Sequence, residues 1–263
     1  MTMNTIDFIT ELFCKVDDNI HDEKHSQAKL YPSEVVTLAL LYALKGTGQR
    51  AFWRWLIRDY SPLFHQLPDR TRLFRLFNSH RHYVERFLAE SSLIGVIDSY
   101  GIELLHPIRE GRSCKQLGKK GISNHRWIVG GKLCYLLNHL GLIVSWDCDT
   151  ANVYDGSAFQ HMVNDVNDQM VVFSDTGFEK KDWNPTNLCV CQRGEWNVRM
   201  FVETVFSMLT YICDFKHSHH KVWSFFETKL GFTMALFNIL VQWHGFQPDE
   251  NGFVHLSIAE FSL

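Results

Sequence analysis

The chain has 263 residues, of which 46% are hydrophobic, enough for one large core or two modest ones. Its seven cysteines are scattered without the paired spacing of a zinc site, which favours a reduced, cytoplasmic compartment over a disulfide framework. No apolar run reaches the roughly 18 to 20 residues of a membrane span, so no membrane partner is expected. The net charge of −3 argues against a uniformly basic polyanion-binding protein.

Residues 1–92 show a helical pattern throughout and form the first of three predicted regions. One helix is expected to start at Ser33 as its N-cap and to stop at Gly46, and Asp69 is expected to cap another. Three arginines recur at every fourth position of a further helix: Arg50, Arg54 and Arg58. Since small helical domains with an arginine stripe commonly bind DNA, this region is predicted to serve DNA binding or assembly.

After residue 92 the hydrophobic period changes. Strands are expected at 93–98, 127–138, 142–148, 170–175 and 187–191, and helices near 156–167, at 197–214 and at about 223–243. The turn Asn138–Gly141 predicts a hairpin between the second and third strands. Three antiparallel strands followed by two strands reached through helices predict an α/β class with an α+β mixed sheet, in the ribonuclease H-like arrangement. This domain is placed at 93–245 and a C-terminal tail at 246–263.

Three acidic residues occupy unusual places in this pattern. Asp98 closes the apolar run Leu93–Ile97, Asp175 closes the run Met170–Ser174, and Glu203 lies within a strongly periodic helix, away from its apolar stripe. A buried ionised carboxylate is costly unless it is paired or metal-bound. Oxygen ligands suit Mg²⁺ or Mn²⁺, so these three residues are predicted to bind metal and to catalyse phosphoryl transfer, with two ions.

Other interpretations of these acids stay open. Asp98 and Asp175 could each cap the turn after a strand, and Glu203 could pair with Arg199 one helical turn earlier. Three competing acids exist: Asp147, Asp149 and Asp155. Asp155 precedes a helix and is better explained as its N-cap. The strand and helix context selects residues 98, 175 and 203.

A basic segment follows Asp98 directly. Between residues 109 and 132 the chain carries seven cations against one anion. DNA phosphates are the natural partners of such a segment. The predicted phosphate contacts are Lys119, Lys120, Arg126 and Lys132.

Five stretches together resemble the DDE transposases of bacterial insertion sequences, whose catalytic domain has the ribonuclease H-like fold: Val96–Ser99, Gly118–Gly121, Trp127–Leu133, Ser174–Phe178 and Arg199–Leu209. In many of these enzymes the helix of the glutamate reads Tyr-x2-Arg-x3-Glu-x6-Lys. Arg199 and Glu203 match this pattern, whereas Trp196 and Thr210 replace the tyrosine and the lysine.

The resemblance implies an enzyme that binds the terminal inverted repeats of its element, nicks donor DNA and joins the exposed 3′-hydroxyl to target DNA. It implies two Mg²⁺ or Mn²⁺ ions, a phosphate contact by Arg199, a homodimer that handles two element ends, and a bacterial cytoplasmic location at the nucleoid. Two alternatives are a catalytically inactive or domesticated DNA-binding relative and a ribonuclease H-like nuclease without strand transfer.

Overall fold

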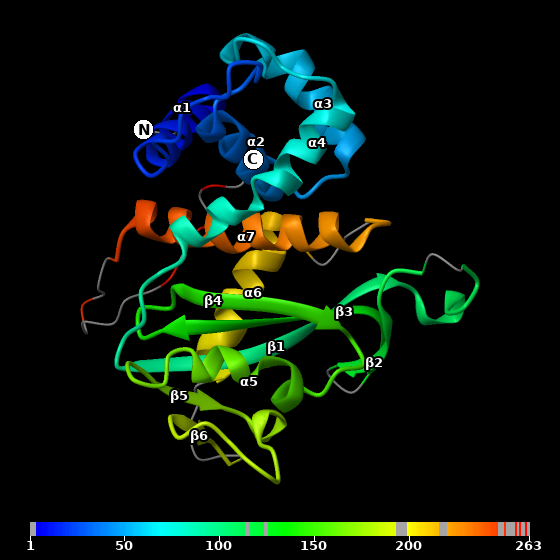
Figure 1. Ribbon diagram of the computed structural model, residues 1–263, viewed down its shortest axis with the longest axis vertical. Helices are drawn as coiled ribbons and strands as arrows, with labels where there is room; N and C mark the ends of the chain where they lie inside the picture. The colour runs from blue at the N-terminus through cyan, green and yellow to red at the C-terminus, as the bar shows by residue number, and fades with distance from the viewer. Residues whose placement is uncertain are drawn as a thin grey trace.

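The computed structural model describes residues 4–113, 116–123, 126–192, 199–215 and 220–246, and the single residues 250, 256, 258 and 261 (Figure 1). The side chains of its second-last helix are described from Val202 onward. The chain folds into a group of N-terminal helices above a mixed sheet, with a long helix between them.

The N-terminal region is helical, as predicted. It contains α1 (Thr5–Asp17), α2 (Pro32–Lys45), α3 (Gln49–Trp55) and α4 (Arg70–Ser79), with the shorter turns η1 (Leu56–Tyr60), η2 (Ser61–Leu63) and η3 (Arg81–Phe87). Gly46 ends α2 with a φ of 62°, a conformation that favours glycine, and the Asp69 side chain caps α4 by accepting the Arg72 N–H at 3.0 Å.

The predicted start of α2 was wrong by two residues. Tyr31 is the N-cap, and Pro32 takes the first helical position, where its missing N–H costs nothing. The Glu34 side chain accepts the Tyr31 N–H at 2.7 Å, which satisfies the N-cap backbone. Ser33 therefore lies inside the helix.

Among the described residues the sheet has six strands: β1 (Ile94–Leu105), β2 (Lys119–Ser123), β3 (Arg126–Asn138), β4 (Ile143–Thr150), β5 (Val171–Ser174) and β6 (Leu188–Val190). β3 pairs antiparallel with β1 on one edge, and on its other edge with β2 and then β4. β5 and β6 add to β1 in parallel. Apart from β2, this is the predicted ribonuclease H-like order, with the expected hairpin between β3 and β4.

β2 was not predicted, because its side chains do not alternate as a half-buried strand should. Only Gly121 is buried in it, and its two lysines are exposed. The strand forms because it pairs with residues 126–130 of β3, which is a tertiary contact. The β2–β3 hairpin projects to one side of the sheet together with the end of β1 and the short helix η4 (Pro107–Arg109) (Figure 1).

Helices cover both faces of the sheet. Helix α5 (Asp155–Asn164) packs through Phe159 and Met162 against the even-numbered side chains of β3, such as Cys134. Helix α6 (Arg199–Cys213) packs through Val202 and Phe206 against the opposite face. A short turn, η5 (Thr176–Phe178), joins β5 to the segment that leads to β6.

Helix α7 (Trp223–His244) runs between the sheet and the N-terminal helices (Figure 1). Its buried apolar residues belong to one hydrophobic cluster that also contains residues of α1, α2, α6 and β4. The predicted division of the chain at residue 92 stays a prediction, and the two regions share this core. No helix in the described part of the chain is both long and apolar enough to cross a membrane.

Candidate active site

The pairing of β1 with β5 brings two of the predicted carboxylates to the same level. Val96 lies opposite Phe173 in parallel register, and two further residues along each strand place Asp98 level with Asp175. Because neighbouring strands lie about 4.8 Å apart, the two residues become close neighbours. β5 ends at Ser174, as predicted, so Asp175 directly follows its strand.

The prediction that Asp98 ends its strand was wrong. β1 continues to Leu105, because β3 pairs with it as far as that residue. Asp98 instead lies within β1, at the level where β5 stops. Within the described residues no strand pairs with this edge of β1 beyond that level. The uncovered edge leaves room for a pocket.

A pocket of about 480 Å³ occupies this position. Asp98, Asp175 and Glu203 all line it, so three elements distant in sequence bring the three predicted carboxylates to one place. The remaining lining side chains are mostly polar or charged: Ser99, Tyr100, Ile122, Ser123, Lys132, Asp155, Phe206 and Ser207. The catalytic role of the three carboxylates stays a prediction.

Tyr135 links two of these carboxylates structurally. It is the β3 residue opposite Asp98, and its hydroxyl donates a hydrogen bond to the carbonyl of Val202 at 3.2 Å, next to Glu203 in α6. Burial, and then the charge of Asp98, raise the pKa of Tyr135 well above its ordinary value, so the phenol stays protonated as a donor. Sequence reasoning missed this residue because it looks like any aromatic core residue.

The other side of the pocket is built by Lys132 and Asp155. Lys132 is buried on β3, and its Nζ donates to the carbonyl of Val153 at 2.9 Å and lies 2.8 Å from Oδ1 of Asp155. The expected N-cap role of Asp155 was wrong, since Tyr154 is the N-cap and Asp155 is the first residue of α5. A lysine within the otherwise apolar run 127–138 was the available signal for this ion pair.

Asp98 of β1 and Asp175, which follows β5, each accept a hydrogen bond from a nearby backbone N–H. Oδ1 of Asp175 accepts the Gly177 N–H at 2.8 Å, so this residue does cap the turn after its strand. Oδ1 of Asp98 accepts the Ser99 N–H at 2.7 Å. The turn-capping interpretation and a place in the pocket are therefore compatible for Asp175.

The donor chemistry of the pocket fits a hard divalent cation. Its charged and polar ligand groups are carboxylates and hydroxyls, and no histidine or cysteine is among the lining residues that the structure describes. No three His, Cys, Asp or Glu side chains of the described residues converge closely enough to form a ready-made metal cluster. Shared binding of one ion by three carboxylates would require their side chains to reorient.

The predicted phosphate contacts fall into two groups. Lys119, Lys120 and Arg126 are exposed on the β2–β3 hairpin, where Lys120 pairs with Glu110 at 3.1 Å and lies over the Trp127 ring. Lys132 is buried and faces the pocket instead. The side chain of Arg199 lies outside the described residues, although its backbone begins α6.

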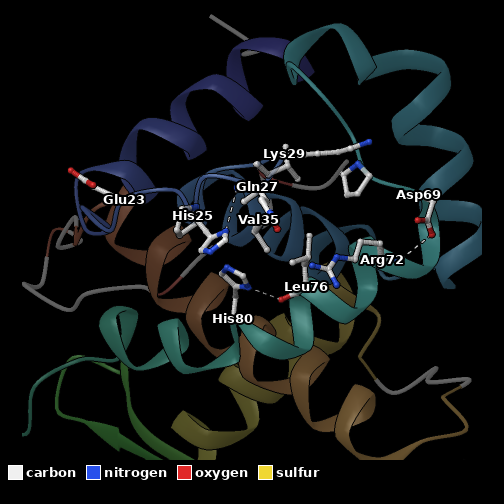
Figure 2. A pocket seen from close by; sticks show the side chains of 13 residues that line it. Glu23, His25, Gln27, Lys29, Val35, Asp69, Arg72, Leu76 and His80 are labelled. Atoms are coloured by element: carbon white, nitrogen blue, oxygen red, sulfur yellow. Dashed lines mark hydrogen bonds between the residues drawn. The ribbon is translucent and has the colours of Figure 1, made fainter.

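A second pocket, of about 560 Å³, lies in the helical N-terminal region (Figure 2). The side chains of His25 and His80 point toward one another in it, and Arg72 of α4 lines it as well. It is larger than the pocket beside β1, but its lining mixes acids and bases and contains none of the three predicted carboxylates. The pocket beside β1 is therefore the better candidate for metal-dependent chemistry.

Comparison with known proteins covers part of the sheet beside this pocket. Residues 88–186 match the family model described as a transposase DDE domain. The matched segment includes Asp98, Asp155 and Asp175 and ends before α6, so Glu203 lies beyond it. No curated protein gives a significant match. Residues 88–186 of the chain are thus similar to a transposase DDE domain.

Proposed function

We propose that the protein is the DNA transposase of an insertion sequence, which cleaves DNA at the ends of its element and joins the 3′-hydroxyl to target DNA. The observation that carries the proposal is that Asp98, Asp175 and Glu203 line one pocket. The two aspartates lie within the segment that matches a transposase DDE domain, and Glu203 lies beyond its end. DNA is the partner that this family implies.

Asp98, Asp175 and Glu203 would hold the divalent cations, Mg²⁺ or Mn²⁺ and two in number. Bound there, such ions activate the attacking oxygen and stabilise the leaving oxygen of an in-line displacement. The protein contributes by placing the carboxylates that would bind the ions. The parallel register sets Asp98 beside Asp175, and the Tyr135 hydrogen bond to Val202 holds the first described turn of α6 against β3.

The β2–β3 hairpin would guide DNA to this pocket. Ile122 and Ser123 of β2 line the pocket, while Lys119 of the same strand is exposed to solvent. Cations next to a carboxylate-lined pocket attract the phosphate backbone, which the carboxylates alone would repel. The N-terminal helices, with exposed Arg50, Arg54 and Arg58, would bind the terminal repeats, and a homodimer would hold two ends together.

The decisive experiment detects joined products. The full chain is incubated with Mg²⁺, a labelled DNA that carries the ends of its element and a target plasmid, and products are resolved on a sequencing gel. A transposase yields labelled ends joined to target DNA. Cleavage without joining would favour a ribonuclease H-like nuclease, and binding without either reaction would favour an inactive relative.

The hairpin makes a separate, measurable prediction. Replacing Lys119 and Arg126 together by glutamine is expected to weaken DNA binding for all sequences alike. The slope of log affinity against log salt concentration should fall by about 1 for each phosphate that the protein no longer neutralises, so by about 2 for the pair. Fluorescence anisotropy at several salt concentrations measures this slope.

The matched control for this prediction is Lys181→Gln, which neutralises an exposed lysine of the β5–β6 connection that does not line the pocket. It should leave the slope close to that of the unsubstituted chain. A reduction of the slope in the control that equals, per removed charge, the reduction in the double variant would show that only net charge matters, and would remove the hairpin from the DNA-binding surface.

A further inference from the structure

The ion pair between Lys132 and Asp155 is largely buried in the wall of the pocket. Lys132 belongs to the central strand β3 and is 8% exposed, and the side chain of Asp155 is 18% exposed. Burying two charges is costly, and well-packed apolar residues of similar size often serve the fold equally well. The pair is also beside the pocket that contains the three predicted metal ligands.

The two oxygens of Asp155 have different surroundings. Oδ1 faces the Lys132 ammonium group at 2.8 Å. Oδ2 faces the turn after β5, where a Cβ added to Gly177 would lie 3.5 Å from it and 2.9 Å from Oδ1 of Asp175. Asp155 therefore directs its second oxygen toward the same glycine that contacts Asp175.

Lys132 also changes the charge balance of the pocket. Four carboxylates and one ammonium group line it. Because Lys132 neutralises Asp155, that carboxylate adds a hydrogen-bond acceptor without adding net negative charge. Carboxylates outside the direct ligand set commonly orient the ligands or the water shell of a metal ion, and their removal typically weakens metal binding 10- to 100-fold.

We propose that Asp155 is a positioning residue of the cation site, in which Lys132 fixes one carboxylate oxygen and the other accepts hydrogen bonds from the hydration shell of a divalent cation at Asp175. The inference rests on the proposed function, because it takes Asp175 as a metal ligand. In this proposal Lys132 is the partner of Asp155. It replaces the DNA phosphate contact that the basic segment predicted for Lys132.

The test measures Mn²⁺ binding to the full chain by isothermal titration calorimetry, without DNA, together with the thermal unfolding midpoint. Asp155→Asn keeps the shape of the side chain but removes its charge and replaces one acceptor oxygen by a donor. We expect it to weaken Mn²⁺ binding by about 10- to 100-fold and, because the buried Lys132 loses its charged partner, to lower the unfolding midpoint, so binding is measured well below that midpoint. The control Asp165→Asn, exposed at the other end of α5, should bind Mn²⁺ like the unsubstituted chain.

A double variant separates this role from a purely structural one. Lys132→Met alone leaves Asp155 without its partner and should lower the unfolding midpoint. Lys132→Met combined with Asp155→Leu replaces the pair by apolar side chains and should restore much of the unfolding midpoint, but not the Mn²⁺ affinity. Mn²⁺ binding by the double variant equal to that of the unsubstituted chain would overturn the proposal.

Asp175→Asn distinguishes this failure from a failure of the proposed function. If Asp175→Asn weakens Mn²⁺ binding and Asp155→Asn does not, the positioning role is wrong and the three-carboxylate site stands. If Asp175→Asn leaves Mn²⁺ binding unchanged, or the unsubstituted chain binds no Mn²⁺, the site assignment itself is wrong and this inference falls with it.

Discussion

Glu203→Gln is expected to reduce Mg²⁺-dependent DNA cleavage on the order of a thousandfold while DNA binding persists. The amide keeps the size of the side chain but loses the negative charge that a divalent cation requires. Glu203 is exposed and points away from the buried stripe of α6, so the substitution should leave the unfolding midpoint unchanged. Gel-based cleavage and anisotropy measurements on the same DNA check both parts.

The control for this substitution is Glu85→Gln, which removes an exposed carboxylate in η3, outside the pocket. It should cleave at the rate of the unsubstituted chain. Combining Glu203→Gln with Asp98→Asn should cost little more than either change alone, because groups that act as a unit are not additive. Metal-dependent cleavage that survives Glu203→Gln would refute the assignment of this residue.

Asn238→Leu is expected to destabilise the fold by about 3 kcal/mol. Asn238 is fully buried in α7, where its Oδ1 accepts the Ile143 N–H at 2.8 Å and its Nδ2 donates to the Phe87 carbonyl at 3.0 Å. Leucine would leave both backbone groups buried without these partners. Urea denaturation measures the free energy of unfolding.

Two features sharpen this second prediction. The Ile143 carbonyl, which Asn238 also contacts at 2.7 Å, keeps a second donor in the Ala89 N–H at 2.8 Å, so it stays hydrogen-bonded in the variant. Gln242→Leu makes a comparable change one turn later in α7, but at an exposed position, and should alter stability by less than about 0.5 kcal/mol. Destabilisation by Asn238→Leu no larger than that by Gln242→Leu would refute the role assigned to the buried hydrogen bonds of Asn238.

Several elements could be predicted from the sequence because their signals are local. The periodic apolar residues of α6, the β3–β4 hairpin and the end of β5 before Asp175 all lie within short windows. The order of these elements predicted the ribonuclease H-like sheet, since short connections and crossover helices leave few ways to arrange them. Other features depended on partners far away in sequence. β2 and the extension of β1 past Asp98 exist because β3 pairs with both.

The choice of the three candidate carboxylates and the resemblance to DDE transposases thus came from the sequence itself, through residue types at the ends of apolar runs and on one helix face. Only the tertiary structure decided that Asp98 lies inside its strand level with Asp175, that Tyr135 ties Asp98 to the helix of Glu203, and that Lys132 pairs with Asp155. The physical reason is that strand register, burial and ion pairing are relations between distant segments, which no local pattern of residues encodes.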